Sequence, residues 1–248
     1  MTQSDRIEGR NPVLEAIKAE REIDKILIAK GAEQGSIQKI IGMAKDRGIP
    51  IQYVERQKLD QMAESHSHQG ILAMVAAYDY VEVDEILKKA QKKGEPPFLV
   101  ILDEITDPHN LGAILRTANA AGVHGIIIPK RRAVGLTAVV AKTSAGAIEY
   151  VSVAKVSNLA RTIDGLKEKG LWIVGADMDG EKTYYEQDMT GNVVLVIGSE
   201  GQGIGRLIKE KCDFIVRIPM KGEMSSLNAS IAASLLMYEV MRQKERKK

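Results

Sequence analysis

The sequence predicts an α/β protein with two modules, over residues 1–79 and 98–248, joined by a linker at 80–97. Two observations lead to this prediction. Short apolar runs typical of strands alternate along the chain with segments in which apolar residues recur at helical spacing. In the second module the runs are almost entirely apolar, as in "VVLVI" at 193–197, which indicates parallel strands covered on both faces. We therefore expect an open, mostly parallel sheet with helices on both sides, preceded by a small α/β sandwich.

The first module begins with a helix-start signal. Asn11 can cap a helix whose first position is Pro12, and Gly48 is suited to end the following helix. The alternation of helices and strands continues to the end of the module. Its predicted helices span residues 11–20, 36–48 and 55–65, and its predicted strands span residues 25–29, 50–54 and 70–78.

The linker is rich in charged residues and contains prolines, and part of it, residues 83–93, can form a short amphipathic helix. From residue 98 the alternation is regular. The predicted strands of the second module span residues 98–102, 125–129, 150–154, 171–176, 193–197 and 214–218. Its predicted helices span residues 111–122, 137–147, 158–170 and 226–243.

The composition is that of an ordinary globular protein. The 248 residues include 35 Lys and Arg against 33 Asp and Glu, so the net charge of +2 indicates no strong attraction to nucleic acid. The single cysteine, Cys212, excludes a disulfide within the chain and a cysteine-based zinc cluster. His66 and His68 have no good third ligand nearby, so we expect no metal there. Without a long apolar run or a signal peptide, we expect a cytoplasmic protein with no membrane span and no structural metal.

A glycine-rich loop at 198–205, "GSEGQGIG", directly follows the strand at 193–197. Its glycines do not have the spacing of a dinucleotide-binding fingerprint, and Ile204 stands where a phosphate-binding P-loop requires lysine. This mismatch argues against a nucleotide-dependent oxidoreductase. Glycines at the carboxyl end of a strand let a ligand approach the backbone, so the loop is either a binding loop or only a tight turn.

Polar residues stand out in three segments, "DPHNLGAILRTANAAG" at 107–122, the glycine-rich loop, and "IPMKGEMSSLNASIAASLLMYE" at 218–239. In chain order these polar residues are Asn110, Arg116, Asn119, Glu200, Ser225, Ser226, Asn228 and Ser230. Ser225 or Ser226 is expected to open the last helix. Taken singly, each segment is explained by helix capping and turn formation.

Taken together and in this order, the three segments resemble the motifs of the SpoU (TrmH-type) RNA ribose 2′-O-methyltransferases of the SPOUT superfamily. The resemblance covers most of 98–248 and is nearest to the bacterial 23S rRNA guanosine 2′-O-methyltransferases. The first 80 residues are similar to the small ribosomal-protein-like RNA-binding domain of some members, through "GRNPVLEAI" at 9–17 and "HQGILA" at 68–73.

The resemblance implies a fold, a cofactor and an assembly. In this family the C-terminal part of the sheet forms a deep trefoil knot, and two copies of the chain form a homodimer in which each site is completed by the partner. S-adenosylmethionine binds in the knot, mainly to backbone groups. The positions that match its binding residues are Gly198, Gly201, Ile218, Met220 and Leu227.

The resemblance also implies the reaction, transfer of a methyl group to a ribose 2′-hydroxyl of RNA without a metal. The matching catalytic positions are Arg116, Asn110, Glu200, Ser226 and Asn228. A guanidinium is a poor base, so Arg116 either fixes a phosphate and polarises the hydroxyl or, with phosphate help, takes up its proton.

The substrate implied is structured RNA, with rRNA favoured over tRNA. The alternatives are a tRNA ribose 2′-O-methyltransferase and a non-catalytic RNA-binding protein with a methyltransferase fold. The basic cluster Lys130–Arg132 either contacts RNA phosphates or is a solvated loop.

Overall fold

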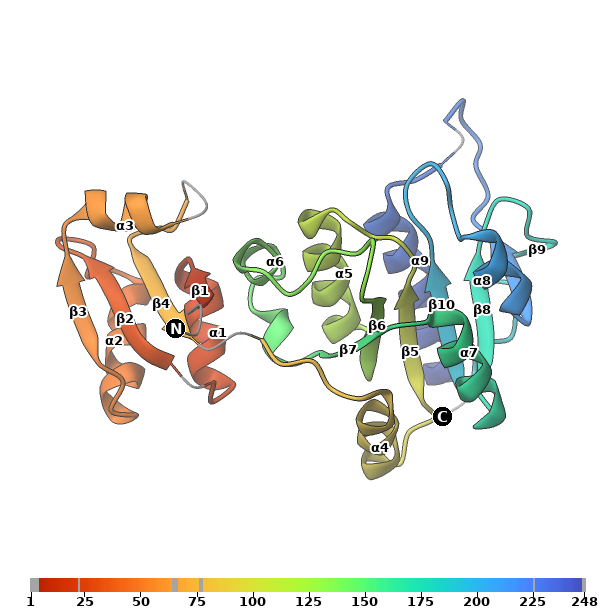
Figure 1. Cartoon of the computed structure of the whole chain (residues 1–248), viewed down its shortest axis with the longest axis horizontal. Helices are drawn as coiled ribbons and strands as arrows, with labels where there is room; N and C mark the ends of the chain where they lie inside the picture. Colours follow the sequence, from red (N-terminus) through yellow and green to blue (C-terminus); the bar gives the residue numbers. More distant parts are fainter. Residues whose placement is uncertain (1–4, 22, 64–66, 76–77, 225, 247–248) are drawn as a thin grey trace. The chain divides into compact units, whose positions relative to one another are not determined.

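The computed structural model describes residues 5–21, 23–63, 67–75, 78–224 and 226–246. The chain forms two compact units. The first unit comprises residues 1–79 together with 135–150, and the second comprises 80–134 together with 151–248. Both are α/β structures, and Figure 1 shows the helices and strands of each.

The first unit contains a four-stranded sheet in the order β1-β4-β2-β3. The strands are β1 (Asp5–Glu8), β2 (Ile23–Ala29), β3 (Ile51–Val54) and β4 (Ile71–Val75), and the helices are α1 (Arg10–Lys18), α2 (Ser36–Asp46) and α3 (Arg56–Met62). Strand β2 shows why helices cover both faces. Its Ile26 and Ile28 pack in the core with α1 and α2, whereas Leu27 packs with Leu59 of α3 on the other face. Strand β1 was not predicted, because "DRIE" is short and mostly charged.

The segment after residue 134 packs with the first unit although it lies within the second predicted module. It contains α6 (Ala138–Thr143) and the 3-10 turn η1 (Ala147–Glu149). The Glu149 side chain, only 6% exposed, pairs with Arg21 at 3.2 Å and accepts a hydrogen bond from the Tyr78 hydroxyl at 2.8 Å. The predicted helix 137–147 therefore exists in shortened form, and its contacts assign it to the first unit.

The second unit is built on a seven-stranded parallel sheet in the order β7-β6-β5-β10-β8-β11-β9. Its strands are β5 (Phe98–Leu102), β6 (Gly125–Pro129), β7 (Ser152–Val156), β8 (Trp172–Ala176), β9 (Lys182–Thr183), β10 (Val193–Ile197) and β11 (Phe214–Arg217). Its helices are α4 (Val83–Lys93), α5 (Pro108–Ala120), α7 (Leu159–Glu168), α8 (Arg206–Lys211) and α9 (Ala229–Arg246). The predicted open parallel sheet is thus confirmed, with β5, β6 and β10 at the predicted residues.

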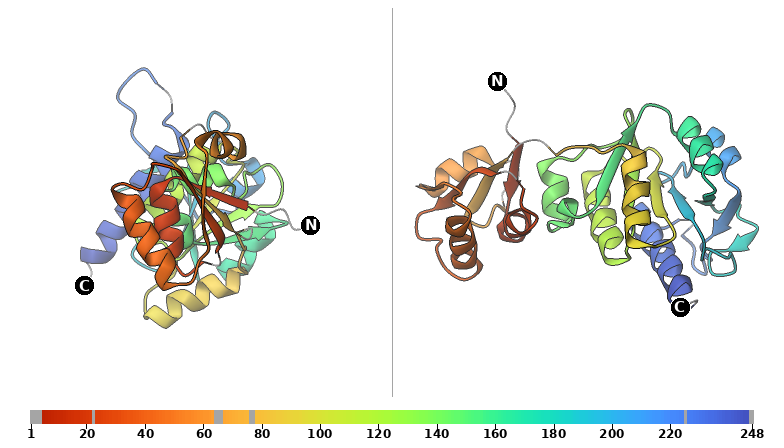
Figure 2. Two further views of the ribbon diagram at one scale, coloured as in Figure 1. Left: turned by 90° about the vertical axis from the view of Figure 1, so that its left-hand side faces the viewer. Right: turned by 90° about the horizontal axis from the view of Figure 1, so that it is seen from below.

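Helices cover both faces of this sheet. Buried residues of α4, α7 and α8, among them Ile86, Ile163 and Ile208, share one core with the sheet residues Ile101 and Val196. Helices α5 and α9 pack against each other, and α9 contacts β10. In Figure 2, α9 (blue) lies on the opposite side of the sheet from α7 (green). Because every strand points the same way, all the strands end at one edge, and polar loops collect there.

Caps explain where two helices begin. Helix α5 begins at Pro108, earlier than predicted, because the Asp107 carboxylate accepts the His109 N–H at 2.9 Å. Helix α9 begins at Ala229, later than predicted, because the Asn228 side chain accepts the Ser230 N–H at 3.0 Å. The short elements β9 and α8 were missed, because two and six residues carry no readable periodicity.

Strand β7 begins two residues later than predicted, because the chain first completes the turn after η1.

The trefoil knot concerns how the chain threads through itself. The order of the strands does not define this threading, so the knot stays a prediction. Within the described residues, no helix is long and apolar enough to span a bilayer.

Candidate functional site

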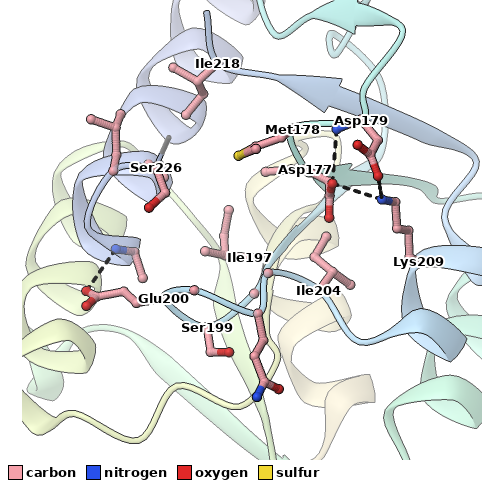
Figure 3. Close-up of a pocket in the computed structure, with 18 of the residues that line it drawn as sticks. Asp177, Met178, Asp179, Ile197, Ser199, Glu200, Ile204, Lys209, Ile218 and Ser226 are labelled. Carbon is pink, nitrogen blue, oxygen red and sulfur yellow. Dashed lines mark hydrogen bonds and ion pairs between the residues drawn. The ribbon is translucent and has the colours of Figure 1, made fainter. Parts of the chain in front are cut away.

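A cavity of about 700 Å³ lies at the edge of the second unit's sheet where β8, β10 and β11 end. Its lining comes from the loop after β8, the glycine-rich loop after β10, the segment after β11, and the start of α9. Figure 3 shows Glu200 on one side of the cavity and Lys209 on the other. A cavity of this volume can enclose much of a nucleoside-sized ligand.

The glycine-rich loop folds back on itself beside the cavity. The Ser199 N–H donates to the Gly203 carbonyl at 3.1 Å, and the Gly203 N–H donates to the Ser199 carbonyl at 2.9 Å. Gly198 directly precedes this closed turn and packs against its far end, where a Cβ would stand 2.0 Å from the backbone carbonyl carbon of Gly203. The residue at 198 must therefore be glycine for the turn to close.

Asp103, at the end of β5, holds the far end of this loop. Its carboxylate accepts the Gly205 N–H at 2.8 Å. Burial raises the pKa of Asp103, and the hydrogen bond from Gly205 opposes that shift by stabilising the carboxylate. Sequence reasoning missed this residue, although its place directly after a central strand was a usable signal.

Glu200 connects the cavity to two asparagines from distant parts of the chain. Its Oε1 accepts hydrogen bonds from Asn110 Nδ2 at 3.0 Å, from the Ala229 N–H at 3.2 Å, and from Asn228 Nδ2. Asn228 Nδ2 also lies 2.9 Å from Asn110 Oδ1. This polar cluster therefore joins α5, the glycine-rich loop and the start of α9 beside the cavity.

The structure brings nine of the ten predicted site residues together. All five residues predicted to bind the cofactor line the cavity, namely Gly198, Gly201, Ile218, Met220 and Leu227. Of the predicted catalytic residues, Glu200 and Ser226 line the cavity too, and Asn110 and Asn228 contact Glu200.

Arg116 is the exception. It is exposed on α5, does not line the cavity, and makes no side-chain hydrogen bond or ion pair with another residue that the structure describes. Six residues, or about 600° of helical rotation, separate it from Asn110, so the two side chains leave α5 in directions about 120° apart. Within one chain, Arg116 is therefore not part of the polar cluster around Glu200.

Sequence reasoning missed a charged wall of the cavity, formed after β8. Asp177 and Asp179 each lie 2.9 Å from the Lys209 ammonium, and these hydrogen bonds raise the pKa of Lys209. The sequence held a usable signal for this wall, because "DMDG" at 177–180 directly follows a buried strand in the same way as the glycine-rich loop follows β10.

His68 and Cys212, considered above for metal binding and disulfide formation, have contacts typical of residues with a structural role. His68 is buried, with Nε2 2.8 Å from Asp60 Oδ1 and Nδ1 accepting the Gly70 N–H at 3.1 Å. His66 lies outside the described residues. Burial raises the pKa of the Cys212 thiol to about 12, which keeps it protonated near neutral pH.

Three kinds of comparison with known proteins point to one family. A model of the SpoU rRNA Methylase family matches residues 97–238, and a model described as RNA 2′-O ribose methyltransferase substrate binding matches residues 6–81. The Bacillus subtilis (strain 168) protein YacO, described as belonging to the TrmH family of tRNA/rRNA methyltransferases, is 54% identical over 98% of this chain and 97% of its own. A Staphylococcus aureus (strain MSSA476) protein described in the same way is 50% identical over 96% of both chains.

Solved structures share the fold. The SpoU methyltransferase AviRb from Streptomyces viridochromogenes, in complex with the cofactor AdoMet, has a TM-score of 0.80 at 23% identity over 97% of this chain and 90% of its own. An AdoMet-bound rRNA methyltransferase from Sinorhizobium meliloti has a TM-score of 0.78 at 22% identity, over 97% and 88% of the two chains. AdoMet is S-adenosylmethionine, the cofactor expected from the motifs. By its matched motifs, its fold and its identity with these relatives, the chain belongs to the SpoU rRNA methylase family.

Proposed function

We propose that this protein methylates a ribose 2′-hydroxyl of RNA with S-adenosylmethionine as the methyl donor, in the cytoplasm. The favoured target is a guanosine of 23S rRNA. One observation carries the proposal: nine of the ten residues that match the family's cofactor and catalytic motifs, distant in sequence, meet around one cavity. The match of residues 6–81 to a substrate-binding model supports assigning RNA binding to the first module.

The cavity suits the cofactor in size and charge. Its charged lining residues are the carboxylates Asp177, Asp179 and Glu200 and the cations Arg206 and Lys209, which leaves an excess of one negative charge. S-adenosylmethionine has the opposite net charge, since it carries a sulfonium, an ammonium and a carboxylate. The closed turn at Gly198 and the residues Ile218, Met220 and Leu227 would hold it. Its sulfonium makes the methyl group electrophilic, so the transfer itself requires no metal.

The polar cluster would position the ribose. Glu200 engages the Asn110 and Asn228 side chains at the border of the cavity, where the ribose hydroxyl must reach the methyl group. As the new C–O bond would form and the S–CH3 bond would break, S-adenosylhomocysteine would leave as a neutral thioether and the hydroxyl proton would pass to solvent. Arg116 would stabilise the developing oxyanion and the adjacent phosphate, a role that suits a permanently charged guanidinium.

Arg116 would act in the site of a second copy of the chain. On its own chain it points away from the polar cluster, and its neighbour Thr117 contacts Ser234 of α9 at 3.1 Å. Helix α9 exposes Ile231, Leu235 and Tyr238, which are spaced to lie on one helical face. An apolar face beside an exposed arginine supports a homodimer formed through the second unit, with Arg116 completing the partner's site.

The first experiment measures transfer of labelled methyl from S-adenosylmethionine to total RNA from cells that lack the gene, followed by nucleoside analysis. The expected product is 2′-O-methylguanosine in 23S rRNA. A different 2′-O-methylnucleoside, or label in tRNA, would keep the reaction and replace the target. Methylation of a base would contradict the reaction, and cofactor binding without transfer to any RNA would support a non-catalytic RNA-binding protein.

The shared site is tested by mixing two variants, Arg116→Ala and Gly198→Ala, under conditions that exchange subunits and at a cofactor concentration low enough that neither variant is active alone. If Arg116 serves the partner's site, each mixed dimer has one intact site. Random mixing should then restore about a quarter of the wild-type activity. If Arg116 serves its own chain's site, no mixed dimer has an intact site and the mixture stays inactive.

A further inference from the structure

A second groove of about 430 Å³ lies on the second unit, where β6 and β7 end. The two strands are parallel neighbours, and the Lys130 N–H, just after β6, donates to the Val156 carbonyl at the end of β7 at 2.8 Å. The chain then turns at Ser157 into α7, which forms another side of the groove. We call this the β6–β7 groove.

The β6–β7 groove has an excess of positive charge. Its lining includes four cations, Lys130, Lys155, Arg161 and Lys169, and two carboxylates, Glu82 and Asp84. Lys169 is ion-paired with Asp84, and Lys155 lies over the Tyr80 ring at 4.9 Å. The side chains of Lys130 and Arg161 are exposed and form no ion pair with any carboxylate in the part of the chain that the structure describes.

The basic cluster noted in the sequence therefore divides in two. Arg132 pairs with Glu104 at 2.9 Å, so its charge is compensated. Lys130 instead lines the groove together with Arg161, which is contributed by the first turn of α7. Residues 31 positions apart thus bring uncompensated charge to one concave surface, an arrangement that suits a polyanion better than a small neutral ligand.

The part of the groove that holds Lys130 and Arg161 lies at the same edge of the sheet as the cofactor cavity, because Lys130 follows β6, Arg161 lies in the first turn of α7 after β7, and all strands of this sheet are parallel. Strands β6 and β7 are two and three positions from β10 in the sheet order. At a spacing of about 4.8 Å per strand, the ends of β6 and β7 lie roughly 10 to 15 Å from the end of β10. An RNA strand whose ribose reaches the cavity can cover that distance within a few nucleotides.

We propose that the β6–β7 groove binds the sugar–phosphate backbone of the RNA substrate, a few nucleotides from the ribose to be methylated. This inference rests on the proposed function and adds a second RNA-binding surface, on the methyltransferase unit itself. Lys130 and Arg161 would each bind a phosphate oxygen, which positions the strand without reading its sequence. The groove should therefore contribute to RNA affinity and not to cofactor affinity.

The test removes the two exposed charges that are unpaired within the described residues, those of Lys130 and Arg161, with the double variant Lys130→Gln/Arg161→Gln in the full chain. The probe is unmodified 23S rRNA transcribed in vitro, and binding is measured by filter retention over a range of salt concentrations. We expect about tenfold weaker binding at moderate salt. We also expect the slope of log K against log salt to fall by about 1.4, or about 0.7 for each phosphate that the variant no longer neutralises. The affinity for S-adenosylhomocysteine should stay at the wild-type value.

Two further variants make the result specific. The control variant Lys92→Gln/Lys93→Gln also removes two positive charges, but from the C-terminal end of α4, away from the groove and near the edge where the strands of the sheet begin. It should leave the slope of log K against log salt unchanged. Lys130→Arg/Arg161→Lys keeps both charges and should bind RNA as the wild type does. A double variant that matches the wild type in affinity and slope, or a Lys92/Lys93 control that is weakened as much, would overturn the proposal.

A small anion is the competing occupant, and inorganic phosphate is its probe. If phosphate raises the melting temperature of the wild type and not of Lys130→Gln/Arg161→Gln, while both bind RNA equally, the groove is an anion site and the RNA proposal is wrong. Failure of the proposed function is distinguishable, since wild-type protein would then bind RNA through the groove yet transfer no methyl group to it.

Discussion

Replacing Gly198 by alanine tests most directly whether the closed turn forms the cofactor site. The new Cβ would lie 2.0 Å from the carbonyl carbon of Gly203 and 2.3 Å from the Ile204 nitrogen, and both atoms belong to the backbone. Because such contacts are not made below 3.0 Å, one side of the turn must move by at least about 1 Å. A displacement of 1 Å breaks hydrogen bonds from the backbone of the turn to a ligand, and losing two such bonds of about 1.4 kcal/mol each weakens binding about 100-fold. We therefore expect S-adenosylhomocysteine to bind about 100-fold more weakly.

Isothermal titration calorimetry measures this weakening, and far-UV circular dichroism verifies that the variant is folded. Gly191→Ala is the matched control, since a Cβ there meets no atom within 4 Å and the residue stands in a bend just before the same strand, β10. The control should bind as the wild type does. A folded Gly198→Ala variant with wild-type affinity would refute the assignment of this turn to the cofactor.

Three further predictions concern the cluster around Glu200, the buried ion pair of the first unit, and the cysteine. Glu200→Ala removes the acceptor that Asn110, Asn228 and the Ala229 N–H share, so kcat in the methyl-transfer assay should fall by tenfold or more. Glu200→Gln keeps an acceptor oxygen and should retain more activity than Glu200→Ala. Arg21→Met leaves the Glu149 side chain without its cation, which should lower the free energy of unfolding of the first unit by about 3–5 kcal/mol in a denaturant titration. Adding Glu149→Met should recover most of that stability. If stability is not recovered, the ion pair is not the cause of the loss. With a thiol pKa of about 12, Cys212 should be a thiolate in roughly one of ten thousand molecules at pH 8. Native protein should therefore resist alkylation by iodoacetamide, whereas denatured protein should react. Rapid alkylation of the native chain would contradict the burial of the thiol.

The sequence predicted the second unit well because parallel strands buried on both faces are continuous apolar runs. Strands β5, β6 and β10 coincide with the predicted residues. Where prediction failed, the cause was local. Strand β1 is too polar to stand out, and the starts of α5 and α9 depend on the side-chain caps Asp107 and Asn228.

The candidate site was largely predictable because its residues lie in motifs with a fixed order along the chain. The motifs contain Asn110, Glu200 and Asn228 but do not reveal that the two amides share one carboxylate oxygen. They also do not contain Asp103, whose hydrogen bond to Gly205 joins the end of β5 to the end of the glycine-rich loop, 102 positions further along the chain. Such contacts depend on which strands become neighbours, and that is a property of the whole sheet.

By itself, the sequence determined the α/β class, the family and the residues of the cofactor loop, because periodicity, glycine spacing and motif order are local properties of the chain. Only the tertiary structure decided that residues 135–150 pack with the first unit, that Arg116 points away from its own chain's polar cluster, and that Lys130 and Arg161 share one groove. The physical reason is that burial and charge compensation are set by neighbours in space. Arg132 and Lys130 are two residues apart in the chain, yet one has a carboxylate partner and the other lines an open basic surface.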